Sequence, residues 1–135
     1  MTPTRKDLLA ALPSHFVRPL APLTADQLAR WASATGQHYV EVDLEAATSK
    51  KSILTAIGRA LGFPAWYGAN LDALYDCLTD LPEREDIRAW LIVLRHLPST
   101  GALDAEQHAA LLEVFRDATE VFADAGVGLR VFHAP

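Results

Sequence analysis

The residues with the clearest chemical pattern in this sequence are three aspartates spaced four residues apart. Asp72, Asp76 and Asp80 share one face if the segment is helical, and Tyr75 lies on the same side. The opposite face carries leucines at helical spacing, namely Leu71, Leu74, Leu78 and Leu81. Carboxylates displayed around a phenol can make charge-assisted hydrogen bonds to arginine and lysine. A merely solvated polar face has the same spacing.

Two aromatic residues and a glycine precede this helix. Trp66 and Tyr67 are followed by Gly68, which permits a close backbone approach or a positive φ. Asn70 can cap a helix that begins at residue 71. Exposed rings beside carboxylates have the composition of a protein-binding hot spot. The alternative is that one of the two rings belongs to the core, and the sequence does not indicate which.

The net charge of the chain is concentrated in the same segment. The 135 residues carry a formal charge of −5, from 12 basic and 17 acidic side chains. Residues 66–86 hold six acidic side chains and one basic side chain, so this stretch carries the whole excess. An acidic chain is unsuited to coating nucleic acid through phosphate neutralisation, whereas a local negative field favours a basic partner. A second acidic series, Glu113, Asp117, Glu120 and Asp124, is interpreted mostly as solvated surface.

Motifs of enzymes and metal sites are not found in this sequence. There is no Ser-His-Asp order, phosphate-binding loop, HExxH sequence or dinucleotide fingerprint. Asp72 and Asp76 could form an acid–base pair, as in glycoside hydrolysis, but they share one helix face without an evident cleft. Cys77 lies among leucines, as a small buried hydrophobe does. The five histidines show no ligand spacing. We therefore expect no enzymatic activity, no cofactor and no metal.

The elements that position these residues follow an α/β pattern. Segments 38–44, 88–95 and 127–132 have the composition of strands. Helical spacing and end signals predict helices over 50–61, 71–81 and 105–125, capped by Thr48 or Ser49, by Asn70 and by Asp104. Residues 88–95 are almost continuously apolar, which is typical of a central strand covered on both faces. Helices between such strands predict a small parallel sheet.

The first 36 residues differ from the rest of the chain. Prolines 13, 19 and 22 fall close together, and we predict two helices, over residues 5–12 and 25–34. Residues 1–36 are therefore interpreted as a helical extension of a domain formed by residues 37–135. The longest apolar run, residues 89–94, is too short to span a bilayer, no secretory leader is apparent, and the single cysteine fits a reducing compartment. We expect a cytoplasmic protein without membrane contact.

A longer motif surrounds the aspartates. The stretch from Leu61 to Leu81, LGFPAWYGANLDALYDCLTDL, resembles the signature of the barstar family, the intracellular inhibitors of secreted bacterial ribonucleases. The segment LEVFRD at 112–117 is similar to the family's helix before its final strand. The resemblance covers about residues 38–133. It implies a barstar-like α/β fold, in which helices pack against a three-stranded parallel sheet.

The resemblance also implies a partner-binding site. Carried over by motif position, its contact residues are Trp66, Gly68, Asn70, Asp72, Tyr75, Asp76 and Asp117. Trp66 stands where the family has Tyr, Tyr75 where it has Trp, and Asp117 where it has Glu. We expect an immunity or antitoxin protein, monomeric when free, whose acidic helix mimics RNA phosphates in the basic active site of a barnase-like ribonuclease or a related toxin. The alternative is a binding module of the same fold that inhibits no ribonuclease.

Overall fold

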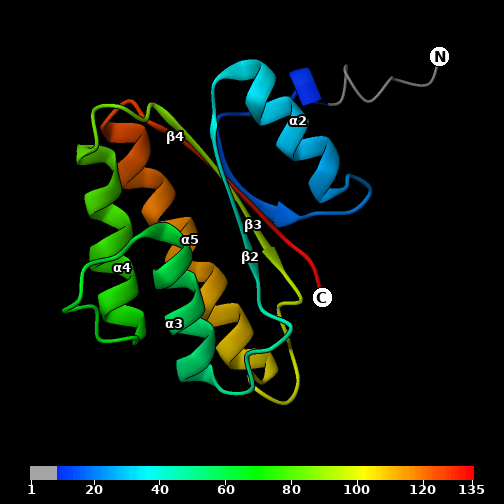
Figure 1. The fold of residues 1–135 in the computed structure, drawn as a ribbon, viewed down its shortest axis with the longest axis vertical. Coiled ribbons are helices and arrows are strands. Elements are labelled where there is room, and N and C mark those ends of the chain that lie inside the picture. Colours follow the sequence, from blue (N-terminus) through cyan, green and yellow to red (C-terminus); the bar gives the residue numbers. More distant parts are fainter. Residues whose placement is uncertain (1–8) are drawn as a thin grey trace.

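A four-stranded parallel sheet forms the centre of the computed structural model, which describes residues 9–135 (Figure 1). The strands are β1 (His15–Pro19), β2 (His38–Asp43), β3 (Ala89–Arg95) and β4 (Gly128–His133). They lie in the order β1-β4-β3-β2, and every neighbouring pair is parallel. The predicted α/β class, with helices against a parallel sheet, is therefore confirmed.

The sheet has one strand more than predicted, so the expectation of three strands is wrong. The additional strand is β1, which pairs with β4 so that Val17 lies opposite Val131. Its signal in the sequence is weak because it is five residues long, follows Pro13 closely and ends at Pro19. Proline is tolerated in a sheet mainly on an edge strand, and β1 is an edge strand. We predicted a purely helical N-terminal segment, but this segment also contributes a strand to the sheet.

Of the two helices predicted in the N-terminal segment, the second is confirmed. α2 (Ala25–Thr35) begins after Thr24, whose hydroxyl oxygen accepts a hydrogen bond from the backbone N–H of Gln27. It ends at Gly36, which adopts a positive φ of 72°. The other predicted helix, over residues 5–12, begins outside the described residues, and residues 9 and 10 are helical.

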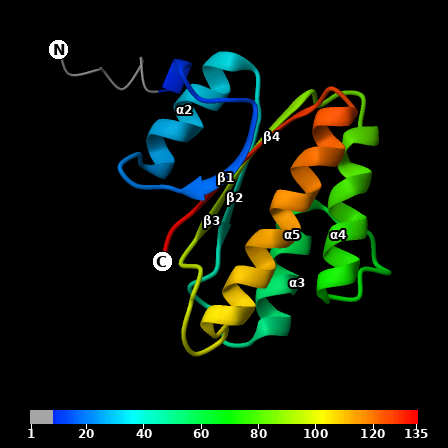
Figure 2. The same ribbon diagram turned by 180° about the vertical axis from the view of Figure 1, so that it is seen from behind.

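The remaining helices cover the face of the sheet opposite to α2 (Figure 2). They are α3 (Lys50–Leu61), α4 (Leu71–Asp80) and α5 (Ala105–Asp124), and a short 3-10 helix, η1 (Leu81–Glu83), follows α4. Each of the three long helices begins after a side-chain cap: Ser49, Asn70 or Asp104. The predicted bounds therefore hold to within one residue. Among the described residues, no helix is both long and apolar enough to cross a membrane.

The central strand β3 separates two apolar cores. Trp90, Ile92 and Leu94 pack toward α3, α4 and α5, whereas Leu91 and Val93 pack toward α2. None of these five side chains is more than 1% exposed. The prediction of a central strand covered on both faces is confirmed. Successive side chains of β3 point to opposite faces of the sheet, so this one strand packs against the helices on both sides.

Candidate protein-binding site

The outer surface of α4 displays the predicted acidic residues. Leu74 and Leu78 are fully buried on one side of the helix, whereas Asp72 and Asp76 are exposed on the other. Tyr75 is 37% exposed, which is unusual for a large aromatic ring in this molecule. The separation of leucine and carboxylate faces that the periodicity predicts is therefore present. Because the leucines anchor α4 in the larger core, the aspartates project from a rigid support.

α5 brings a fourth residue to this surface. Its Asp117 lines a shallow hollow together with Asp72, Tyr75 and Asp76 of α4. The hollow measures about 370 Å³, and the partly buried Leu71 and Val114 also line it. We call these four residues, Asp72, Tyr75, Asp76 and Asp117, the acidic face. Residues 41 or more positions apart in the chain are joined here because α4 and α5 pack side by side (Figure 2).

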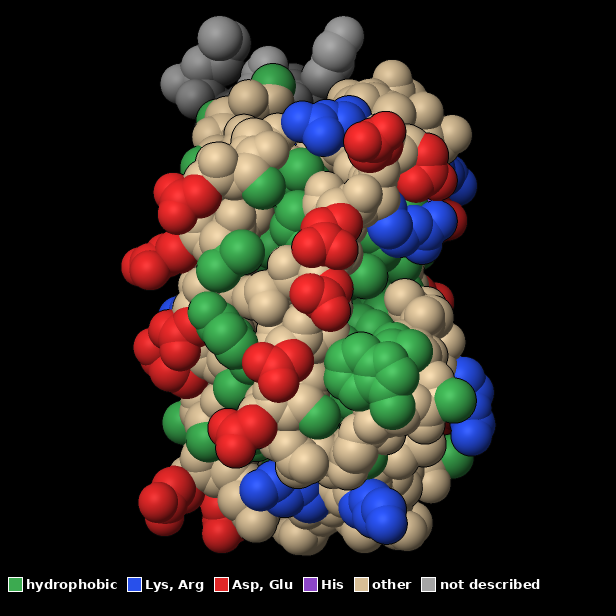
Figure 3. All heavy atoms as spheres, turned by 90° about the vertical axis from the view of Figure 1, so that its left-hand side faces the viewer, with side chains coloured by type: hydrophobic (Ala, Val, Ile, Leu, Met, Phe, Trp, Pro, Cys, Tyr) green, Lys and Arg blue, Asp and Glu red, His purple; other side chains and the backbone are tan. Residues whose placement is uncertain are grey.

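The carboxylates of the acidic face have no cationic partner among residues 9–135. In the part of the chain that the structure describes, no ion pair involves Asp72, Asp76 or Asp117. Figure 3 shows this side of the molecule: acidic side chains are spread over it with hydrophobic ones between them, and Lys and Arg lie toward its edges. The face therefore offers unpaired negative charge beside apolar surface. This combination suits a basic partner surface.

The two rings before α4 have different environments. Trp66 is 64% exposed and is the most exposed large hydrophobic side chain among the described residues. Tyr67 is half-buried, and its hydroxyl donates a hydrogen bond of 2.9 Å to the carbonyl oxygen of Leu54 in α3. Its ring packs edge to face on Phe63 with centroids 5.0 Å apart. Burial raises the pKa of Tyr67 to about 12. Tyr67 is thus the core ring of the pair, and Trp66 is available to a partner.

Gly58 in α3 makes room for the ring of Tyr67. A Cβ atom on Gly58 would lie 2.6 Å from Cδ2 of that ring, closer than atoms can pack, and 3.2 Å from the ring of Phe63, which is a tight contact. The sequence contains a signal for this contact, since a glycine in the middle of a predicted helix is unfavourable without a packing reason. Gly58 therefore belongs to the support of the binding loop, although it does not reach its surface.

Gly68 and Asn70 shape the turn that leads into α4. The amide oxygen of Asn70 accepts a hydrogen bond of 2.8 Å from the backbone N–H of Ala73, which starts the helix. Ala69, which lies between Gly68 and Asn70, adopts a positive φ of 50°. Gly68 is exposed, and a Cβ there would lie 3.0 Å from Nδ2 of Asn70. Trp66, Gly68 and Asn70 therefore lie on the connection before α4 and do not line the hollow that contains the acidic face.

The chemistry available at this surface is that of binding. The groups that line the hollow are three carboxylates, one phenol and two aliphatic side chains. Cys77 is buried on the inner side of α4, where burial raises the pKa of its thiol and the carboxylates of Asp80 and Asp76 raise it further. The thiol is therefore held in its unreactive protonated form, away from the acidic face.

Comparison with known families accounts for this arrangement. A family model described as "Barstar (barnase inhibitor)" matches residues 37–134, which is well over half of the chain and includes β2, β3, β4 and the three helices between them. The matched region contains every residue of the acidic face and of the connection before α4. Members of this family are inhibitor proteins and not enzymes. The chain belongs to the barstar family.

Proposed function

We propose that this protein inhibits a bacterial ribonuclease, or a related toxin, by binding to its basic active site. The observation that carries the proposal is the gathering of Asp72, Tyr75, Asp76 and Asp117 in one exposed hollow. Membership of the barstar family supports the same conclusion. An organism that makes such a toxin needs protection from it inside the cell, so the role is that of an immunity protein or antitoxin.

The mechanism follows from the chemistry of RNA cleavage. A ribonuclease gathers arginine, lysine and histidine around the scissile phosphate, and its cleft is therefore positive and concave. Carboxylates on a helix can occupy the positions of RNA phosphates and accept charge-assisted hydrogen bonds from the same cations. Asp76, in the middle of α4, is the proposed central anchor, with Asp72 beside it. Trp66 and Tyr75 would exclude water around these pairs.

The residue types on the surface bear on which enzyme is bound. Trp66, Tyr75 and Asp117 each differ in size from the residue that the family pattern has at the same position. A side chain that is longer or shorter by about one ångström changes which basic group it can reach. We therefore propose a ribonuclease related to barnase, or another toxin with a basic cleft, as the partner. No nucleic acid or membrane is required for this interaction.

The same departures favour a second candidate function. A barstar-fold module could retain the acidic face and bind a different basic protein without inhibiting a ribonuclease. The two functions differ in one measurement: an inhibitor abolishes RNA cleavage at one equivalent, whereas a binding module associates with its partner and leaves ribonuclease activity intact.

The decisive experiment is a titration of the protein into a basic ribonuclease, first of all one encoded beside its own gene, with RNA cleavage as the readout. We expect complete inhibition by the wild-type protein. Replacing Asp76 by alanine removes hydrogen bonds to charged groups, each worth about 1.5–3 kcal/mol, so the affinity should fall by about 10- to 150-fold for each bond lost. Asp26→Ala is a matched control, because Asp26 is an exposed helical aspartate on α2, across the sheet.

The outcome that contradicts the proposal is an equal and small effect of both substitutions. The rate of association gives a second readout, because negative charge on this face attracts a basic partner over a distance. Raising the ionic strength from about 0.01 M to about 1 M shortens the screening length from about 30 Å to about 3 Å, so association should slow steeply. An association rate that does not depend on salt argues against electrostatic attraction.

A further inference from the structure

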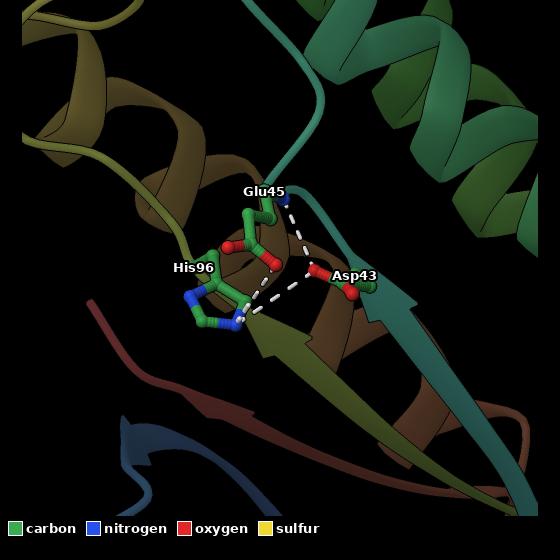
Figure 4. Close-up of side chains that lie close together, drawn as sticks. All are labelled: Asp43, Glu45 and His96. Carbon is green, nitrogen blue, oxygen red and sulfur yellow. Dashed lines mark hydrogen bonds and ion pairs between the residues drawn. The ribbon is translucent and has the colours of Figure 1, made fainter.

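A histidine and two carboxylates meet at the carboxyl end of the sheet, outside the acidic face. Figure 4 shows Asp43, Glu45 and His96 turned toward one another from the ends of β2 and β3. Nε2 of His96 lies 3.9 Å from Oδ1 of Asp43 and 4.0 Å from Oε2 of Glu45. One ligand atom from each residue lies within 4.8 Å of the other two. We propose that this trio binds a divalent transition-metal ion such as Zn²⁺.

The sheet holds two of the three residues at a defined separation. β2 and β3 are parallel, with Asp43 opposite Arg95, and the backbone N–H of Leu44 donates a hydrogen bond of 2.9 Å to the carbonyl oxygen of Arg95. Asp43 and His96 are therefore neighbours across a hydrogen-bonded ladder. Glu45 follows two residues after Asp43, and its backbone N–H donates a hydrogen bond of 3.0 Å to the Asp43 carboxylate. The backbone positions of the three residues are thus set by the fold.

The local charge favours a cation. Two carboxylates face one imidazole, and no ion pair within the described residues joins Asp43 or Glu45 to a lysine or arginine. The nearest candidate by sequence, Arg95, lies instead 3.7 Å from Glu41. A metal ion would neutralise negative charge that no lysine or arginine among the described residues balances.

The donor set and its spacing indicate the class of metal. Imidazole nitrogen with carboxylate oxygen suits zinc and its transition-metal neighbours, whereas calcium and magnesium prefer sites made of oxygen alone. Two ligand atoms bonded to one tetrahedral zinc ion at about 2.1 Å lie about 3.4 Å apart, so the distances from His96 to Asp43 and to Glu45 must each close by about half an ångström. The side chains of Glu45 and Asp43 are 75% and 54% exposed and are free to make this adjustment. Their exposure also leaves the remaining coordination positions to water.

Sequence spacing gives no sign of this site. The two carboxylates precede the histidine by about 50 positions, and a search for nearby ligands along the chain does not connect them. The expectation that the protein binds no metal rests on such spacing. The arrangement of the three side chains in space favours a metal site despite their spacing in the sequence. The site is independent of the proposed inhibitor function, since none of the three residues belongs to the acidic face.

The test is calorimetric titration of the full chain, without an affinity tag, with zinc chloride. We expect one equivalent to bind to the wild-type protein, and His96→Ala and Asp43→Asn each to weaken binding at least about tenfold. His38→Ala is the matched control, because His38 is an exposed histidine on β2 outside the trio, and it should leave the affinity within about threefold of wild type.

A second readout locates the ion directly. Nitrogen NMR of the histidine rings should show the Nε2 resonance of His96 moving on addition of zinc chloride, while the resonances of His38 stay in place. The proposal is overturned if the wild-type chain does not bind zinc, if His96→Ala binds as the wild type does, or if zinc perturbs the histidines without preference for His96.

Discussion

Single carboxylates in this protein fall into two groups, those with a cationic neighbour and those without one. Asp26 forms an ion pair of 2.9 Å with Arg30, one helical turn further along α2. Both side chains are exposed, so the pair contributes little to stability. The carboxylates of the acidic face, Asp72, Asp76 and Asp117, make no such pair in the described part of the chain. An unpaired carboxylate on a rigid helix retains its full capacity to bind a partner's arginine or lysine. The proposed function depends on this difference and not on the number of acidic residues.

The environment of His133 predicts how the stability of the protein depends on pH. It is half-buried near the end of β4, and burial lowers its pKa, with the charges of His108 and Arg116 lowering it further. Below about pH 6.5 the unfolded chain therefore binds a proton that the folded chain resists, and the free energy of unfolding falls as the pH decreases. Urea denaturation between about pH 7.5 and pH 5 should show a smaller decrease for His133→Gln than for the wild type. Identical pH profiles would contradict the assignment.

At the scale of elements, the connection between α3 and α4 determines how the binding residues are presented. Its interior is the edge-to-face pair of Phe63 and Tyr67, and the hydrogen bond from Tyr67 to Leu54 ties it to α3. Trp66 is the exposed side chain on its outer surface, and the connection ends at Asn70, which caps α4. The exposed ring and the helix therefore share one support, so a change beneath the loop should also alter the surface above it.

Because Gly58 contacts Tyr67, we expect Gly58→Ala to destabilise the protein, the opposite of the usual effect of this substitution in a helix. In an ordinary helix, Gly→Ala stabilises by up to about 1 kcal/mol. Here the new Cβ overlaps the ring of Tyr67, and overpacking of this kind costs about 1–3 kcal/mol, so Gly58→Ala should lower the free energy of unfolding. In a Tyr67→Ala background the overlap with the ring of Tyr67 is absent and only the 3.2 Å contact with Phe63 remains, so the same substitution should be less destabilising. Urea denaturation of the four proteins of this double-mutant cycle measures the coupling. Destabilisation of equal size in both backgrounds would show that the ring is not the cause.

At the scale of the whole molecule, the sheet is covered on both faces by segments from different parts of the chain. α3, α4 and α5 cover one face, and α2 covers the other, where Leu28 and Ala32 pack on Leu91, Val93 and Phe132. The family match begins at residue 37 and leaves out β1 and α2. We propose that residues 37–135 form the barstar-like domain and that residues 1–36 are an extension, of which the described residues 9–36 fold onto it.

The extension should be necessary for the stability of this particular domain. Removing residues 1–36 exposes the apolar side chains of β3 and β4 that α2 covers and leaves β4 as an unpaired edge, which favours association. We expect the shortened protein to unfold at lower urea concentration and to aggregate, as measured by light scattering. A shortened protein that remains monomeric with unchanged stability would show that the extension is an independent appendage.

A point substitution tests the same packing without deletion. Leu28 of α2 is fully buried against the sheet, and Leu28→Ala should lower the free energy of unfolding by about 2–5 kcal/mol because it leaves a cavity. Ser33→Ala is the matched control, since Ser33 is exposed on the same helix and its replacement should change stability by less than about 0.5 kcal/mol. Equal effects of the two substitutions would mean that α2 does not pack tightly on the sheet.

The sequence by itself determined the elements of residues 37–135 and the face of α4 that carries the aspartates. These features depend on short-range rules: caps at Ser49, Asn70 and Asp104 start the helices, and the spacing of leucines sets which side of a helix is buried. Periodicity within ten residues decides which residues of α4 share a face, whereas the expectation that this face binds a partner comes from the family resemblance.

Only the tertiary structure decided which distant segments lie together. It paired β1 with β4 across more than 100 residues, brought Asp117 beside Asp76, distinguished the exposed Trp66 from the half-buried Tyr67, and placed His96 next to Asp43. The physical reason is the same in each case. Such neighbours are chosen by burial and by strand order over the whole chain, and local spacing contains no information about either.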